Sequence, residues 1–485
     1  MTRASWSDRA HRSGAARTAA GHGRQALTVS RRFMAPVLLG LLGGCSFYRA
    51  MPLNLTTVDK ALQAPPIETV KIAAARLDHP LVKSMMIDGE GGFTPDEIAV
   101  MAVIVSPQLR TVRDQRGLAQ AQVVQAGILP NPQWSQSADI PHGNSDPTLV
   151  TGRTLGFGWD LSALLTRHDD VAAAKATAQS VDLQIAWQEW QVAQDARLRA
   201  FRIASMQERL PLAREIEAGL AGNVTAIRQA FALGHKVTAE LTAATNLYTQ
   251  ARDSRLALEQ NLIADRLALD LSLGLPAEAP LVIRAPETLP ALEADTSASS
   301  ALVAGIETHR LDLVALTLGY QSQEFALRSA ILSQFPKIGL SVTRANDTSD
   351  IKSRGWAIAV EVPLFDRRQG VIATAKATRQ QLFDDYVARV AEARAQVQQI
   401  FENLAVIRAQ LTSATESLAD LQQLAGGYER AFASQNADVI AYRDARAALA
   451  TRRIEQIKLK QDLLELAVGL EIATGRALLT STITR

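Results

Sequence analysis

Few side chains in this 485-residue sequence have the type and spacing that catalysis or metal binding requires. The segment Gly89-Glu90-Gly91-Gly92 is glycine-rich, but it lacks the lysine and the preceding strand of a phosphate-binding loop. There is no GxSxG or HExxH motif, and no two histidines stand at the helical spacing of a metal site. The histidines are scattered over positions 11, 22, 79, 142, 168, 235 and 309. The sequence therefore predicts no enzymatic activity, no cofactor and no metal ion.

Cys45 is the only cysteine, so no intrachain disulfide and no cysteine-built metal site can form. Arg31 and Arg32 precede an apolar run over 33–44 that is too short to span a bilayer, which is typical of a secretory signal. The run ends in Leu42-Gly43-Gly44-Cys45 and resembles the bacterial lipobox, whose acylated cysteine becomes the mature N-terminus. We expect a signal peptide over 1–44 and lipidation at Cys45, and Ser46 is compatible with delivery to the outer membrane.

Two alternatives stay open for this N-terminal region. Cys45 is also compatible with a small buried side chain in an ordinary apolar segment. Residues 1–30 are longer than a signal needs, so they are either an extended basic region or precede the true start.

The charge distribution argues against nucleic-acid binding. The chain has 51 basic and 49 acidic residues, and residues 1–44 hold seven arginines and one aspartate. The remainder therefore has 44 basic and 48 acidic residues. A body without a basic surplus lacks the main electrostatic contribution to phosphate binding, so no nucleic-acid partner is expected.

The elements that organise the chain occur twice, at an offset of 201 residues. The segment Ala174-Lys175-Ala176-Thr177 recurs as Ala375-Lys376-Ala377-Thr378, and Gly274 recurs as Gly475. Each copy is predicted to contain a helix, two strands, a very long helix, a turn and a returning long helix. A mainly helical, duplicated architecture follows.

The second strand of each copy alternates between bulky apolar and small or polar residues. The apolar set is Leu155, Phe157, Trp159 and Leu161 in the first copy, and Trp356, Ile358, Val360 and Val362 in the second. The small or polar set is Gly156, Gly158 and Asp160, then Ala357, Ala359 and Glu361. We expect the apolar set to face lipid and the other set to face the lumen of a barrel. A soluble sheet packed on one face would produce the same alternation.

The long helices are expected over about 167–231 and about 368–433, each roughly 100 Å at the rise of an α-helix. Pro211 is expected to kink or interrupt the first one, because proline removes an amide donor and clashes one turn back. The turns that follow cover 233–238 and 434–439. Gly234 suits the end of a helix, and Thr238 or Asp438 suits the start of the next, so both turns can be read as helix capping alone.

These segments resemble the TolC-like outer membrane efflux proteins over about 94–476, specifically the lipoprotein branch of that family. The entry to the first strand at 127–132, Pro336, and the segment 355–366 are similar to the family's strand regions. Thr94-Pro95-Asp96-Glu97 is similar to its opening helix, although Ser106 departs from the usual Asn-Pro phrase. The boundaries that we expect are a signal peptide at 1–44, an anchored segment at 45–93, repeats at 94–274 and 301–476, a linker at 275–300 and a tail at 477–485.

The resemblance implies a homotrimer whose chains contribute four strands each to a twelve-stranded β-barrel in the outer membrane, continuous with a periplasmic α-helical tunnel. Such a chain is the passive exit duct of a tripartite efflux or secretion system, with a periplasmic adaptor protein and an inner-membrane pump as partners. The turn at Leu233, Gly234, Val237 and Thr238 resembles the tip that engages the adaptor. The alternative function is a lipid-anchored periplasmic coiled-coil protein without a pore.

The second turn supplies candidates for a gate. A duct open to the periplasm would leak, so its helical tips should constrict when idle, and polar groups near a three-fold axis would then come close together. Glu429, Arg430 and Asp438 are the nearest candidates. Helix capping by Asp438 and a solvated turn are the alternative.

Overall fold

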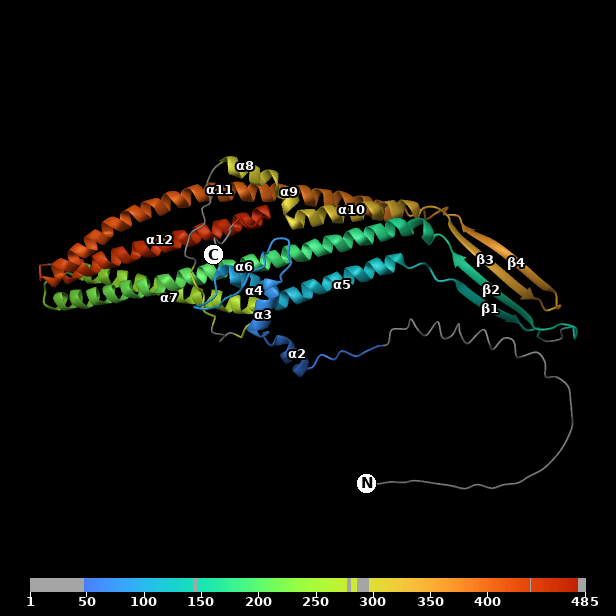
Figure 1. The fold of residues 1–485 in the computed structure, drawn as a ribbon, viewed down its shortest axis with the longest axis horizontal. Helices are drawn as coiled ribbons and strands as arrows, with labels where there is room; N and C mark the ends of the chain where they lie inside the picture. The colour runs from blue at the N-terminus through green and yellow to red at the C-terminus, as the bar shows by residue number, and fades with distance from the viewer. Residues whose placement is uncertain (1–47, 143–145, 277–280, 286–295, 437, 479–485) are drawn as a thin grey trace, which may run out of the picture. The chain divides into compact units, whose positions relative to one another are not determined.

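The computed structural model describes residues 48–142, 146–276, 281–285, 296–436 and 438–478 (Figure 1). The predicted signal peptide and Cys45 lie outside these residues. The chain divides into two units between Ala61 and Leu62. In the first unit, Asn54 Oδ1 accepts the Thr57 N–H at 2.9 Å where α2 (Leu55–Leu62) begins. None of the described helices combines the length and the apolar content that a bilayer crossing requires.

Two copies of one series of elements make up most of the second unit. The first copy consists of α5 (Pro107–Gly127), β1 (Gln133–Asp139), β2 (Gly152–Asp160), α6 (Ala163–Ala232) and α7 (Thr238–Leu273). The second consists of α10 (Leu311–Leu332), β3 (Lys337–Asn346), β4 (Lys352–Glu361), α11 (Gln369–Ala433) and α12 (Val439–Thr474). Helices α7 and α12 both have 36 residues and begin and end 201 positions apart. The element order predicted from the duplication is therefore present.

The strands form one antiparallel four-stranded sheet in the order β1-β2-β3-β4, so the two copies meet where β2 pairs with β3. The register sets Phe157 opposite Val342 and Val342 opposite Trp356. The outer edges of β1 and β4 have no partner among the described strands.

Four of the helices in the two copies pack against α6. Its first half contacts α5 and α10, and its second half contacts α7 and α12, which run beside it in Figure 1. Its 70 residues correspond to roughly 105 Å. The helix continues through Pro211, so it is not interrupted there, and a kink at this residue stays a prediction. Neighbouring helices on both sides hold the chain in helical geometry despite the missing amide donor.

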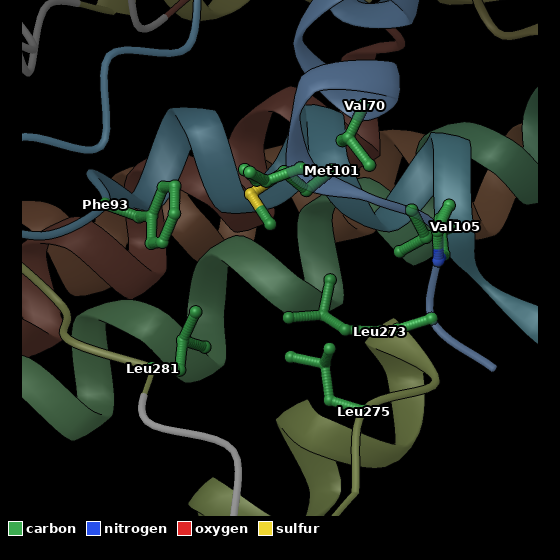
Figure 2. A pocket seen from close by; sticks show the side chains of 10 residues that line it. Val70, Phe93, Met101, Val105, Leu273, Leu275 and Leu281 are labelled. Atoms are coloured by element: carbon green, nitrogen blue, oxygen red, sulfur yellow. The ribbon is translucent and has the colours of Figure 1, made fainter.

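Shorter helices complete the middle of the second unit: α3 (Ile67–Ala75), α4 (Pro95–Val105), α8 (Thr296–Ala304) and α9 (Ile306–His309). Helix α4 starts with a capping box, in which Thr94 Oγ1 accepts the Glu97 N–H and Glu97 Oε2 accepts the Thr94 N–H. Figure 2 shows an apolar pocket of about 270 Å³ between α3, α4 and the end of α7. Its lining includes Val70, Met101 and Leu273 and provides no convergent polar groups, so it is a gap in the packing and not a site for chemistry.

Candidate functional site

One face of the sheet is apolar across both copies. Side chains alternate along a strand, so the register joins the odd-numbered residues of β2 to the even-numbered residues of β3 and β4. The two predicted apolar sets therefore share one face, and Ile338, Leu340 and Val342 of β3 lie between them. Trp356 is 74% exposed and Val360 is 52% exposed. Leu161 and Val362 follow directly after the ends of β2 and β4.

The opposite face has small and polar residues, as the alternation predicts. Gly156 is buried there, and a Cβ atom at this position would come within 2.5 Å of Ser135 Oγ, so a larger residue would require the Ser135 hydroxyl to move. Lys337 Nζ and Glu361 Oε2 form an ion pair at 3.0 Å across β3 and β4. The same face contains Gly158, Asp160, Ala357 and Ala359.

The sheet has no core of its own among the described residues. All ten residues of β4 are exposed, and both faces of this strand are open. A soluble sheet packed on one face would bury one alternate set, so this arrangement is not what that alternative predicts. The apolar face needs another apolar medium or another chain to cover it.

The first turn between long helices has the geometry of a helix end stabilised by glycine. Gly234 adopts a φ of 76°, and its N–H donates to the Phe231 carbonyl at 2.9 Å. Leu233 and Val237 are 72% and 62% exposed. The cap of the next helix is Val237 and not Thr238, because Glu240 Oε2 accepts the Val237 N–H at 3.0 Å and α7 begins at Thr238. The expectation of a Thr238 cap is wrong by one residue.

The second turn repeats this geometry without the glycine. Gln435 occupies the position equivalent to Gly234 and adopts a φ of 60°. Its N–H donates to the Phe432 carbonyl at 3.0 Å, and the Asn436 N–H donates to the Ala431 carbonyl at 2.8 Å. The two turns are therefore alike in backbone, although the second holds a side chain in the left-handed region.

The three gate candidates all lie at this second turn. Glu429 and Arg430 lie near the end of α11, and Asp438 is the residue before α12. The Asp438 side chain makes no capping hydrogen bond, so capping by its carboxylate is not observed. Asp438 is close enough to Lys236 of the first turn to raise the pKa of that amine, although hydrogen bonding to Glu240 is the larger cause.

Polar contacts between α6 and α12 lie just beyond the turns, and no sequence pattern predicted them. Asn223 Nδ2 donates to Asp444 Oδ1 at 2.7 Å, and Arg446 pairs with Glu215 at 2.5 Å. Burial raises the pKa of Asp444, while the hydrogen bond from Asn223 opposes this shift. These contacts join the two repeats near their tips. The residues stand more than 200 positions apart, so local patterns could not reveal them.

A buried ionic cluster joins the two repeats at the other end of α12. Arg197 of α6 pairs with Glu471 of α12 at 2.8 Å and with Asp96 of α4 at 2.6 Å. Glu471 is fully buried and also accepts hydrogen bonds from Gln194 Nε2 at 3.0 Å and the Leu478 N–H at 2.6 Å. The cluster holds three helices and the end of the described chain together.

His79 is the one buried ring among the histidines that the structure describes, and its role is structural. The Leu81 and Val82 N–H groups donate to its Nδ1, and its Nε2 lies 3.1 Å from the Ala186 carbonyl oxygen. Burial lowers the pKa of His79, although Glu189 opposes this shift. Within the described ranges, no three His, Cys, Asp or Glu side chains gather into a metal-binding group.

Several solved structures of outer membrane proteins have a similar fold. The chain matches the outer-membrane channel OprN with a TM-score of 0.65 and 14% identity, over 89% of this chain and 99% of that one. It matches the outer membrane protein VceC of Vibrio cholerae with a TM-score of 0.62 and 15% identity, over 79% and 97%. It matches the MtrE outer membrane channel of Neisseria gonorrhoeae with a TM-score of 0.62 and 15% identity, over 79% of this chain and 89% of that one. No protein-family model matches the sequence, and no curated protein matches it.

Proposed function

We propose, on the premise that the chain has the fold of TolC-like outer-membrane channels, that it is the exit-channel subunit of a tripartite efflux or secretion system. In this role it is a passive conduit from the periplasm to the exterior and not an enzyme. The observation that carries the proposal is the four-stranded sheet whose apolar face is exposed. A lipid environment is the medium that such a face requires.

Closure of a barrel needs more than one copy of the chain. Four strands leave two edges whose backbone groups lipid cannot satisfy. Helices α7 and α11 also have exposed apolar side chains, including Ile263 and Val406. Three chains would pair edge to edge into twelve strands, and the helices would surround the tunnel below.

Conductance of the purified full chain tests this function. Reconstituted in planar bilayers, the protein is expected to give stable unitary currents. In mild detergent it should migrate as a trimer that dissociates on heating. A lipid-anchored coiled coil without a pore would give neither current nor heat-modifiable trimer, and that result would replace the proposal with the alternative.

At the opposite end of the helices, Leu233, Gly234, Val237 and Thr238 form the proposed docking site for a periplasmic adaptor. Exposed apolar side chains on a well-formed turn support this role. Site-specific photo-crosslinking from position 237 to a co-expressed adaptor is the direct test. Crosslinks that form equally well from an exposed position in the middle of α6 would reject a docking role specific to the tip.

Glu429, Arg430 and Asp438 form the proposed gate at the second turn. The double substitution Asp438→Ala and Arg430→Ala should raise single-channel conductance and cell permeability to large antibiotics. Unchanged conductance with an intact trimer would show that the constriction is formed by other residues. Asn223 and Asp444 are the next candidates.

Lipid attachment at Cys45 completes the proposal. We expect labelled palmitate to mark the wild-type protein and not Cys45→Ala, while the variant still assembles because twelve strands already embed the trimer. If palmitate did not label the wild-type protein, the proposed lipid anchor would be rejected, but the proposed channel function would not.

A further inference from the structure

The apolar face of the sheet ends in a cluster of arginines. Arg153 of β2, Arg344 of β3 and Arg354 of β4 have the same parity as the apolar residues and follow them toward the hairpins. Arg344 is directly opposite Arg354, and Arg153 is its diagonal neighbour on the other side. All three side chains are exposed.

This cluster lacks partners within the described part of the protein. None of the three arginines makes a side-chain hydrogen bond or ion pair with another described residue. Two nearby aspartates form hydrogen bonds within the hairpin between β3 and β4. Asp347 Oδ1 accepts hydrogen bonds from the Ser349 and Ile351 N–H groups, and Asp350 Oδ1 accepts one from Asn346 Nδ2. Like charges directly opposite each other destabilise a sheet, and an anion between them removes that repulsion.

A groove connects the arginines to the aromatic part of the face. It has a volume of about 460 Å³, and its lining includes Trp134, Phe157, Trp356, Arg344 and Arg354. One end of the groove is therefore cationic and the other apolar. A ligand that complements it has a phosphate group joined to hydrocarbon, because guanidinium groups bind phosphate through paired hydrogen bonds.

The position along the strand agrees with a lipid headgroup. From Arg354 to Val362 the chain advances eight residues, about 26 Å along a strand or about 20 Å across a membrane when tilted. The apolar band of an outer-membrane barrel is about 25 Å tall. The arginines thus lie within about 5 Å of the outer boundary of the band, near which the cost of a charge that faces lipid is lowest.

We propose that Arg153, Arg344 and Arg354 bind the phosphorylated headgroup of a lipid in the outer leaflet of the outer membrane, whose acyl chains pack on Trp134, Phe157 and Trp356. This inference rests on the proposed barrel, because it requires the apolar face to be in contact with lipid. The occupant differs from the lipid attached at Cys45, since it is not covalently bound and lies at the opposite surface of the membrane.

Native mass spectrometry of the full-length protein tests the site with defined lipids. The probes are bis-phosphorylated lipid A, the same glycolipid without its phosphates, and phosphatidylethanolamine. The wild-type protein should retain lipid A about tenfold better than the dephosphorylated form, because a charge-assisted contact is worth about one decade of affinity. Arg344→Ser with Arg354→Ser should lose this preference, and Arg344→Lys with Arg354→Lys should keep part of it.

The matched control is Lys337→Ser, which removes a cation from the other face and the other end of β3 and should bind lipid A as the wild type does. Equal retention of phosphorylated and dephosphorylated lipid by the wild type would overturn the site, without need of any variant. Conductance of the same preparations separates the two proposals. Conducting channels without phosphate preference reject only the lipid site, whereas absence of channels rejects the barrel and the lipid site together.

Discussion

The two repeats have nearly the same backbone but differ where each returning helix ends. Position 270 in α7 and position 471 in α12 are equivalent, and both hold buried acids, Asp270 and Glu471. Glu471 is paired with Arg197, while no described side chain donates a hydrogen bond to Asp270. Burial raises the pKa of Asp270, and Arg266 only partly opposes this shift. The two returning helices are thus alike in length, but among the described residues only the acid of the second copy forms an ion pair.

The largest expected effect on stability comes from removing the Arg197 side chain. Arg197→Ala leaves Glu471 and Asp96 without their shared cation, and breaking a buried pair costs about 3–5 kcal/mol of unfolding free energy. Denaturant unfolding followed by circular dichroism measures it. Arg116→Ala, which breaks an exposed pair with Asp182, is the control at about 1 kcal/mol or less. Equal losses in both variants would mean that the buried cluster stabilises no more than a surface pair.

The second prediction compares the effect of a charge at equivalent lipid-facing positions of the two copies. Trp159 and Val360 are equivalent, and we expect Asp at either position to lower the yield of membrane-extracted trimer, since a charge facing lipid costs on the order of 2 kcal/mol. Trp159→Asp should be the worse variant, because Trp159 Nε1 also donates to the Pro130 carbonyl at 2.8 Å.

The matched controls are Gly158→Asp and Ala359→Asp, which place the same charge on the other face and should be milder. Equal losses on both faces would reject the lipid-facing assignment.

A smaller effect distinguishes the two turns. Gln435→Gly should raise stability by about 1 kcal/mol, because glycine adopts a positive φ without the Cβ penalty. Gly234→Gln should lower it by a similar amount. Thermal melting of the two variants side by side measures the difference. A destabilising Gln435→Gly would show that the Gln435 side chain makes a compensating contact.

The smallest effect concerns Asp270. Its folded-state pKa is raised, so the proton stabilises the fold at low pH, and that contribution is lost as pH rises through the folded pKa. Asp270→Asn should therefore be neutral or stabilising at pH 7, within about 1 kcal/mol, and should reduce the dependence of stability on pH. Unfolding midpoints between pH 3.5 and 7 test this sign. Strong destabilisation at pH 7 would reveal an unrecognised partner for the carboxylate.

The sequence was most informative about features that repeat or alternate. The offset of 201 residues predicted equivalent ends for α7 and α12, and the period of two predicted that Phe157 and Trp356 share a face. It failed where tertiary packing overrides a local rule, as at Pro211. It also failed at Val237, where a side chain three residues ahead provides the cap.

Contacts such as that of Arg197 with Glu471 join residues 274 positions apart and leave no local pattern.

Because α7 and α12 each have 36 residues, the length of the returning helix is encoded separately in each repeat. A deletion of seven residues from each of the two long helices of one hairpin would draw its tip back by about 10 Å, while the tip of the other hairpin stayed in place. In the proposed trimer, the docking end would then be uneven around its circumference. If the protein is the proposed channel, its reach across the periplasm therefore changes only through paired changes in both halves. Natural variants of different reach should differ by matched insertions or deletions in the two hairpins.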